Sequence, residues 1–88
     1  MWELTYTNQA KRDKKNIERS NLSKVLSELL ELLQVNPFTN PPTYEKLSGY
    51  ANIYSRRINI KHRLVYEIKE SDKTVRIISM WGHYDDNG

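Results

Sequence analysis

The sequence predicts an α+β fold in which two helices near the N-terminus pack on one face of an antiparallel β-sheet. Three observations support this prediction: an alternating segment at the start, a leucine-rich helical stripe after it, and strand-like segments in the second half. The 88 residues are expected to form one domain, residues 1–88, with a single modest core. The expected order is one strand, two helices and three strands.

The N-terminal half contains the first predicted strand and both helices. Residues 1–7 alternate large apolar and polar side chains, as a half-buried strand does. Thr7 or Asn8 is expected to cap a mostly solvated helix that ends near Arg19. A second helix carries the main apolar stripe, and Pro37 is expected to end it. The stripe consists of Leu22, Val25, Leu26, Leu29, Leu30 and Leu33.

The second half contains a stiff loop and the remaining strands. Three prolines in residues 36–43 restrict the backbone to extended or turning conformations. Residues 53–60 and 63–69 are expected to pair as a hairpin around a turn at residues 61–62. Residues 75–81 are largely apolar on both sides, which is typical of a strand inside a sheet. The sheet face opposite the helices is expected to be open to a ligand.

Composition excludes several classes of function. The chain has no cysteine, which removes disulfides and zinc–thiolate sites and fits a reducing, cytoplasmic location. No apolar run approaches the roughly 20 residues of a membrane span, and no signal-peptide pattern opens the sequence. His62 and His83 are far apart, and no glycine-rich phosphate loop or serine-hydrolase elbow is present. We therefore expect no membrane partner, no metal and no cofactor.

A local excess of positive charge lies between Lys46 and Arg63. The net charge is only +3, but this segment contains no acidic residue. Such a patch suits a polyanionic partner, although a solvated strand pair on an ordinary basic protein explains it equally well. Its basic residues are Lys46, Arg56, Arg57, Lys61 and Arg63.

Glu45, Arg63 and His83 supply the groups that metal-free RNA cleavage needs. A carboxylate can take the proton of a ribose 2′-hydroxyl, and an imidazolium can protonate the departing 5′-oxygen. A guanidinium offers a planar fork of donors that matches phosphate oxygens, and alternation places Arg63 on the strand face opposite Leu64. The alternatives are an ordinary loop acid and a surface histidine without a catalytic role.

Other basic and aromatic side chains are candidates for binding RNA. Arg56 and Arg57 are both phosphate-binding candidates, but adjacent strand residues point to opposite faces, so they cannot share one groove. Arg56 could instead cover the edge of the core with its stem. The aromatic rings could stack on bases or pack in the core. They belong to Tyr50, Tyr54, Trp81 and Tyr84.

Five short motifs follow one another along nearly the whole chain. They are Pro37-Phe38, Glu45-x-Leu47-x-Gly49, Tyr54-Ser55-Arg56-Arg57-Ile58, His62-Arg63-Leu64-Val65-Tyr66 and His83-Tyr84. In this order they resemble the YoeB (Txe) branch of the RelE-type toxins. The resemblance implies a RelE-like fold and a toxin of a type II toxin–antitoxin pair. Such a toxin enters the ribosome and cleaves mRNA in the A site, leaving a 2′,3′-cyclic phosphate and a 5′-hydroxyl.

The resemblance also implies roles for single residues. Glu45 matches the general base of the family, His83 its general acid, Arg63 its phosphate clamp and Tyr84 its C-terminal tyrosine. Less secure supporting positions for binding RNA or phosphate fall on Lys46, Arg56 and Arg57. The implied partners are the ribosome with its A-site mRNA and a cognate antitoxin of the Phd/YefM type. The chain departs from the family pattern by continuing after Tyr84 with Asp85-Asp86-Asn87-Gly88.

A non-catalytic toxin or RNA-binding module of the RelE/ParE fold is the alternative. The gyrase-poisoning ParE-like relatives lack the acid–base pair, so the presence of Glu45 and His83 favours an enzyme. The sequence leaves open the codon preference, the antitoxin-binding surface, and whether the chain is a monomer or a homodimer.

Overall fold

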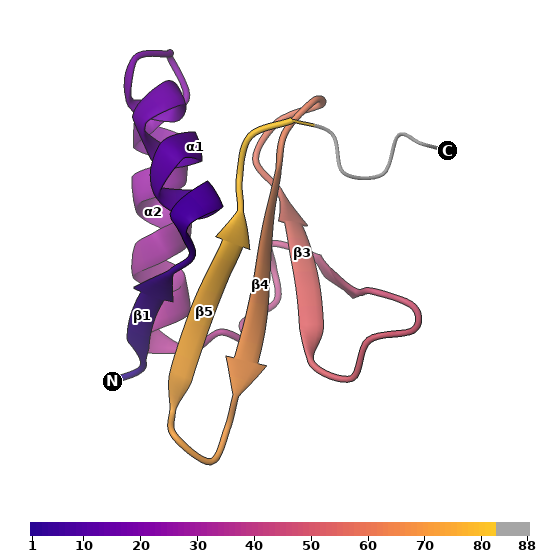
Figure 1. The fold of residues 1–88 in the computed structure, drawn as a ribbon. Coiled ribbons are helices and arrows are strands. Elements are labelled where there is room, and N and C mark those ends of the chain that lie inside the picture. Colours follow the sequence, from indigo (N-terminus) through magenta and orange to yellow (C-terminus); the bar gives the residue numbers. More distant parts are fainter. Residues whose placement is uncertain (83–88) are drawn as a thin grey trace.

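Two helices lie against one face of a five-stranded sheet in the computed structural model, which describes residues 1–82 (Figure 1). The elements are β1 (Glu3–Tyr6), α1 (Asn8–Glu18), α2 (Ser23–Val35), β2 (Tyr44–Lys46), β3 (Ile53–Arg57), β4 (Arg63–Lys69) and β5 (Thr74–Ser79). The predicted α+β class and both helices are confirmed. The sequence did not indicate β2, because a strand of three residues is too short to show an alternating pattern.

The sheet has the strand order β1-β5-β4-β3-β2 and is mixed. β1 pairs in parallel with β5, with Leu4 beside Val75, whereas the other pairs are antiparallel. The prediction of a fully antiparallel sheet is therefore wrong for β1, because alternation within a strand carries no information about the direction of its partner. β5 lies between β1 and β4, which confirms its predicted place inside the sheet.

α1 begins at a side-chain cap that also ties the helix to the sheet. The Thr7 hydroxyl oxygen accepts a hydrogen bond from the Ala10 amide at 3.0 Å, which satisfies a donor at the helix start. The same hydroxyl donates to the carbonyl of Ile78 at 2.8 Å. Asp13 and Ile17 lie with Ala10 on the buried side of the helix. The helix ends one residue earlier than the sequence predicts.

α2 supplies most of the apolar surface of the helical layer. The predicted leucine stripe is confirmed, although Val25 lies at its edge and is 38% exposed. The helix ends at Val35, shortly before Pro37, as expected because a proline disfavours helical backbone in the residue that precedes it. The leucines share one core with the facing sheet side chains Leu64, Tyr66, Ile68, Val75 and Ile77.

β3 and β4 form the predicted hairpin, but β3 is shorter than predicted. The amides of Ile58 and Asn59 both donate to the carbonyl of His62. The Asn59 side-chain oxygen accepts from the amides of Lys61 and His62, at 2.9 and 2.7 Å. These bonds begin the turn at Ile58, so β3 ends at Arg57.

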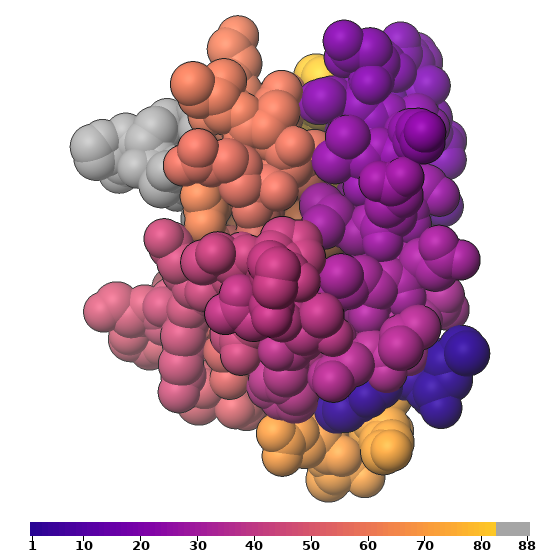
Figure 2. Space-filling model, turned by 180° about the vertical axis from the view of Figure 1, so that it is seen from behind, coloured from indigo at the N-terminus to yellow at the C-terminus, as the bar shows by residue number. Residues whose placement is uncertain are grey.

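The strand register sorts the side chains of the hairpin onto two faces. Leu64 and Tyr66 point to the helices, while Arg63 lies on the opposite face as predicted. Glu45 pairs with Ser55 across β2 and β3, so both share the face that carries Arg63. Seen from behind in Figure 2, the segment that connects α2 to β3 lies beside the helices.

Candidate functional site

A carboxylate and a guanidinium meet on the sheet face opposite the helices. Arg63 Nη2 donates a hydrogen bond to Glu45 Oε1 at 3.2 Å. The two residues come from β4 and β2, with β3 between them. The Glu45 side chain is 68% exposed and that of Arg63 only 15%, so the carboxylate lies at the rim with the guanidinium beneath it. The fold thus brings together two of the three groups that the sequence selects.

Ser55 holds the Arg63 guanidinium from the intervening strand. Its hydroxyl oxygen accepts hydrogen bonds from Arg63 Nε at 3.1 Å and from Nη2 at 2.9 Å. Ser55 is only 1% exposed, so this oxygen has a fixed place beneath the guanidinium. Among residues 1–82, the side-chain hydrogen bonds of Arg63 engage Nε and Nη2, and Nη1 carries two further N–H donors.

Ser55 is a site residue that the sequence-based prediction missed. It belongs to the Tyr54-Ser55-Arg56-Arg57-Ile58 motif, in which only the charged arginines were selected as candidates for binding phosphate. Arg57 pairs with Arg63 in the hairpin, and Ser55 lies two residues before Arg57 on the same strand. Pairing of the predicted hairpin would therefore have placed Ser55 on the face of Arg63. The strand register therefore indicated Ser55 as a site residue, although its residue type did not.

The contact between Glu45 and Arg63 contributes little to stability. Partly exposed ion pairs are worth about 0–1 kcal/mol, because water screens them and ordering two long side chains costs entropy. A phosphate that enters the site offers more negative charge and a geometry that matches the guanidinium fork. Arg63 can therefore exchange its carboxylate partner for a phosphate at low cost.

Glu45, Arg57 and Arg63 line one cavity of about 260 Å³, together with Pro42 and Thr43. Arg57 is exposed and lies directly across from Arg63 in the pairing of β3 with β4. Two guanidinium groups and one carboxylate leave the lining with an excess of positive charge. This charge suits a phosphodiester backbone.

Arg56 lies on the other face, and its predicted role in binding phosphate is wrong. Its side chain is fully buried, so a phosphate of RNA cannot reach it. The guanidinium donates to the Tyr66 hydroxyl at 2.9 Å and to the carbonyls of Pro37 at 2.9 Å, Thr39 at 2.8 Å, and Pro42. The expectation from strand alternation, that Arg56 and Arg57 cannot share one groove, is confirmed.

The buried Arg56 anchors the proline loop that leads into β2. It binds three carbonyls of this loop and lies over the Tyr44 ring, with 4.8 Å between the guanidinium carbon and the ring centroid. Burial raises the pKa of the Tyr66 hydroxyl, and the positive charge of Arg56 opposes this shift only in part. Because the loop runs directly into β2, Arg56 fixes the segment that presents Glu45.

Within residues 1–82, the other basic and aromatic candidates do not line the cavity with Glu45. Lys46 is exposed, but it follows Glu45 in β2 and therefore points to the other side of the strand. Tyr50 is 59% exposed. Tyr54 belongs to an aromatic cluster with Phe38, Tyr44 and Tyr66, so its ring serves packing.

His83 and Tyr84 lie outside the described residues. Their predicted roles, general acid and C-terminal tyrosine of the site, therefore stay predictions. The described chain ends with Met80, Trp81 and Gly82, which follow β5 directly.

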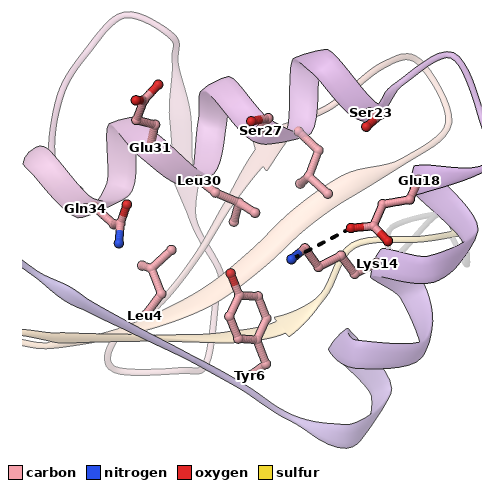
Figure 3. A pocket seen from close by; sticks show the side chains of 10 residues that line it. Leu4, Tyr6, Lys14, Glu18, Ser23, Ser27, Leu30, Glu31 and Gln34 are labelled. Atoms are coloured by element: carbon pink, nitrogen blue, oxygen red, sulfur yellow. Dashed lines mark ion pairs between the residues drawn. The ribbon is translucent and has the colours of Figure 1, made fainter.

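A larger cavity, about 530 Å³, lies between β1, α1 and α2, at the opposite edge of the sheet from β2 (Figure 3). Leu4 and Leu30 contribute apolar surface to it, and burial raises the pKa of the Tyr6 hydroxyl on its wall. Lys14 Nζ and Glu18 Oε2 lie 3.8 Å apart at its lining and balance each other's charge. Among the described residues, none that the sequence selects for chemistry lines this cavity.

The described part of the chain has neither a cluster of metal ligands nor a membrane-spanning helix. Within residues 1–82, no group of three or more histidine, cysteine, aspartate or glutamate side chains could hold a metal ion. Neither of the two helices there is long and apolar enough to cross a bilayer.

The fold is that of bacterial toxins from toxin–antitoxin systems. The structure of a YoeB dimer from Staphylococcus aureus matches with a TM-score of 0.80 and 34% identity, covering 94% of this chain and 98% of that one. The toxin in a YoeB–YefM complex from Staphylococcus aureus matches with a TM-score of 0.77 and 35% identity, covering 96% of this chain and 99% of that one.

The sequence comparisons narrow this class to one family. The model of the YoeB-like toxins of bacterial type II toxin–antitoxin systems matches residues 2–84. Toxin YoeB from Synechocystis sp. is 41% identical over 76 residues, which cover 82% of this chain and 76% of that protein. The chain belongs to the YoeB-like toxin family.

Proposed function

We propose that the chain is a ribosome-dependent endoribonuclease that cleaves mRNA in the ribosomal A site and so inhibits translation. The observation that carries this proposal is the contact between Glu45 and Arg63 in a cavity that also contains Arg57. Membership of the YoeB-like toxins supports it. The proposed reaction uses acid–base chemistry of side chains and needs neither a metal nor a cofactor.

Glu45 acts as the general base in this proposal. It takes the proton from a ribose 2′-hydroxyl, and the 2′-oxygen forms a bond to the adjacent phosphorus. The bond between that phosphorus and the 5′-oxygen of the next nucleotide breaks, and His83 gives the departing oxygen a proton. The products are a 2′,3′-cyclic phosphate and a 5′-hydroxyl, and no water is consumed.

Arg63 stabilises the negative charge that develops on the phosphate during this attack. Ser55 fixes its guanidinium before substrate arrives, and donors held in place stabilise a transition state without further reorganisation. Arg57 adds a second guanidinium to the same cavity. Tyr84, which follows His83 in the sequence, is the fourth residue of the proposed catalytic set. Lys46 binds the RNA backbone outside the cavity.

Substrate binding releases the base from its ion pair. In the free protein Glu45 accepts a hydrogen bond from Arg63 Nη2, which holds the carboxylate at the rim of the cavity. When the scissile phosphate takes over the guanidinium, Glu45 becomes available to accept the proton of the 2′-hydroxyl. Arg63 thus positions the Glu45 carboxylate before the substrate binds and the scissile phosphate afterwards.

A cognate antitoxin of the Phd/YefM type silences the toxin in this proposal. The YoeB–YefM complex from Staphylococcus aureus supports such a partner, and the YoeB dimer from the same organism supports a homodimer. Action on translating ribosomes implies a cytoplasmic location.

The decisive experiment maps cleavage by primer extension on mRNA in programmed ribosomes, with naked mRNA as the control. The unsubstituted chain should cut only when ribosomes are present. Glu45→Gln and His83→Ala should each reduce cleavage by roughly 10²-fold or more, while ribosome binding stays nearly unchanged. Glu67→Gln is the matched control, because Glu67 also contacts an arginine, Arg76, at 3.5 Å but lies outside the cavity.

Two results would overturn the proposal. Cleavage by the Glu45 and His83 variants equal to that of the unsubstituted chain would remove both residues from the reaction. Ribosome binding without any cleavage by the unsubstituted chain would favour the non-catalytic toxin instead.

A further inference from the structure

The chain that leaves β5 is held by side chains from two distant parts of the sequence. Asp13 Oδ2, on α1, accepts hydrogen bonds from the amides of Met80 at 2.9 Å and Trp81 at 3.3 Å. His62 Nδ1, in the turn before β4, accepts the next amide, that of Gly82, at 2.7 Å. Three consecutive backbone donors are therefore bound by two side chains, and this arrangement is called the β5 clasp below.

The ring of His62 adds a second contact to the clasp. It stacks on the Trp81 ring, with 4.0 Å between the ring centroids and 15° between the planes. The bond from Gly82 requires that Nδ1 carry no proton, so one imidazole both faces an aromatic ring and accepts a backbone hydrogen bond. A substitution can remove either contact and keep the other.

Asp13 contributes a buried carboxylate to the β5 clasp. Its side chain is almost fully buried, at 2% exposure, and a buried carboxylate is unfavourable unless hydrogen bonds satisfy it. Oδ1 accepts from Gln9 Nε2 at 2.7 Å, and Oδ2 accepts the two amides of the clasp. The buried carboxylate is thus satisfied by three hydrogen bonds, two of which hold the chain that leaves β5.

Gly82 has a backbone conformation that favours glycine. Its φ is +101°, a backbone conformation that residues with a side chain rarely adopt. A Cβ atom at this position would meet nothing within 4 Å, so the need for glycine is conformational and not steric. The backbone turns at the residue whose amide His62 binds, immediately before His83 in the sequence.

We propose that Asp13 and His62 are positioning residues, which fix the chain at residues 80–82, directly before the proposed general acid His83 in the sequence, and thereby support proton transfer to the departing 5′-oxygen. This inference rests on the proposed ribonuclease function. A general acid must be held within hydrogen-bond reach of its target, and a displacement of about 1 Å can cost about 10²-fold in rate. The clasp supplies that restraint from α1 and from the β3–β4 turn together.

Two substitutions of His62 separate its contacts. His62→Asn keeps an acceptor at the δ position but loses the ring, whereas His62→Phe keeps a ring for stacking on Trp81 but loses the acceptor. The single-turnover cleavage rate on programmed ribosomes should fall about tenfold or more in His62→Phe and much less in His62→Asn. The toxin concentration that gives half the maximal rate should stay unchanged in both, because the clasp acts on the chemical step.

Asp13 is tested in the same assay. Asp13→Ala removes the acceptor for two amides, while Asp13→Asn retains one side-chain oxygen that can accept them. Cleavage should therefore fall at least about tenfold in the alanine variant and be largely restored in the asparagine variant. Asp72→Asn is the control, because it removes an exposed carboxylate in the β4–β5 turn.

Amide hydrogen exchange tests the clasp without using cleavage. Exchange at Gly82 should become at least about tenfold faster in His62→Phe, and exchange at Met80 similarly in Asp13→Ala, whereas protection in the middle of β4 stays unchanged. Unchanged exchange at these amides, or full cleavage by both His62→Phe and Asp13→Ala, would overturn the inference. Failure of the unsubstituted chain to cleave, with clasp exchange as expected, would count against the ribonuclease proposal alone.

Discussion

Replacement of Arg56 by lysine tests whether this arginine is a structural anchor. Its guanidinium makes four hydrogen bonds from its three nitrogen atoms, to the Tyr66 hydroxyl and to three carbonyls of the proline loop. A lysine ammonium has three donors on a single atom and cannot reproduce the planar fork. At least one of the four acceptors therefore loses its partner in Arg56→Lys.

The size of the effect follows from these contacts. Hydrogen bonds to a charged group contribute about 1.5–3 kcal/mol each, and an unsatisfied buried carbonyl costs about 1–3 kcal/mol. Two of the four acceptors, the carbonyls of Thr39 and Pro42, are only partly buried and can form hydrogen bonds to water instead. Their loss therefore lowers the free energy of unfolding less than the loss of a fully buried hydrogen bond would. We expect Arg56→Lys to lower the free energy of unfolding by about 3–5 kcal/mol.

The neighbouring arginine provides a matched control. Arg57→Lys makes the same chemical change one residue further along β3, but at an exposed side chain, and should alter stability by about 0.5 kcal/mol or less. Urea unfolding followed by circular dichroism measures both variants. Equal stability of the two variants would refute the reasoning, since it would mean that the buried guanidinium and its carbonyl partners do not hold the loop.

Three further outcomes are expected. Arg63→Lys should fold normally but recover only part of the cleavage that Arg63→Ala loses, because an ammonium cannot hold phosphate in a fork; full activity in a primer-extension assay would exclude a fork-like contact. Ser55→Ala should lower the single-turnover rate about tenfold, since it frees the Arg63 guanidinium, with a loss of stability of about 1 kcal/mol in urea unfolding. Burial raises the pKa of Tyr66 above its ordinary value of 10.0, so the neutral hydroxyl stabilises the fold below that pH and this contribution is lost as the pH rises through the folded-state pKa. Tyr66→Phe should accordingly show a shallower loss of stability at alkaline pH, and an unchanged slope would count against ionisation of this buried hydroxyl.

Local patterns in the sequence were sufficient to predict most of the secondary structure. The leucine stripe defines α2 because a buried helix face repeats every three to four residues. The hairpin of β3 and β4 follows from two alternating segments separated by a short turn. The selection of Glu45 and Arg63 rested on chemistry and on the family resemblance, and the fold joins them in one contact.

Strand direction and register decided what these patterns left open. β5 reaches β1 only after the two helices and three further strands, and nothing within β1 records whether this pairing is parallel or antiparallel. The same holds for β2, which has only three residues and exists through its pairing with β3.

Taken alone, the sequence determined the α+β class, the two helices and the central hairpin, because each depends on short-range periodicity. It also supplied the acid, base and arginine candidates, through the chemistry of the residue types and the family resemblance. Only the tertiary structure decided that Arg56 is buried while Arg57 lines the cavity, that Ser55 holds Arg63, and that Asp13 and His62 meet at the end of β5. These are contacts between residues far apart in the chain or on paired strands. Their geometry is fixed by register and packing, which no local pattern encodes.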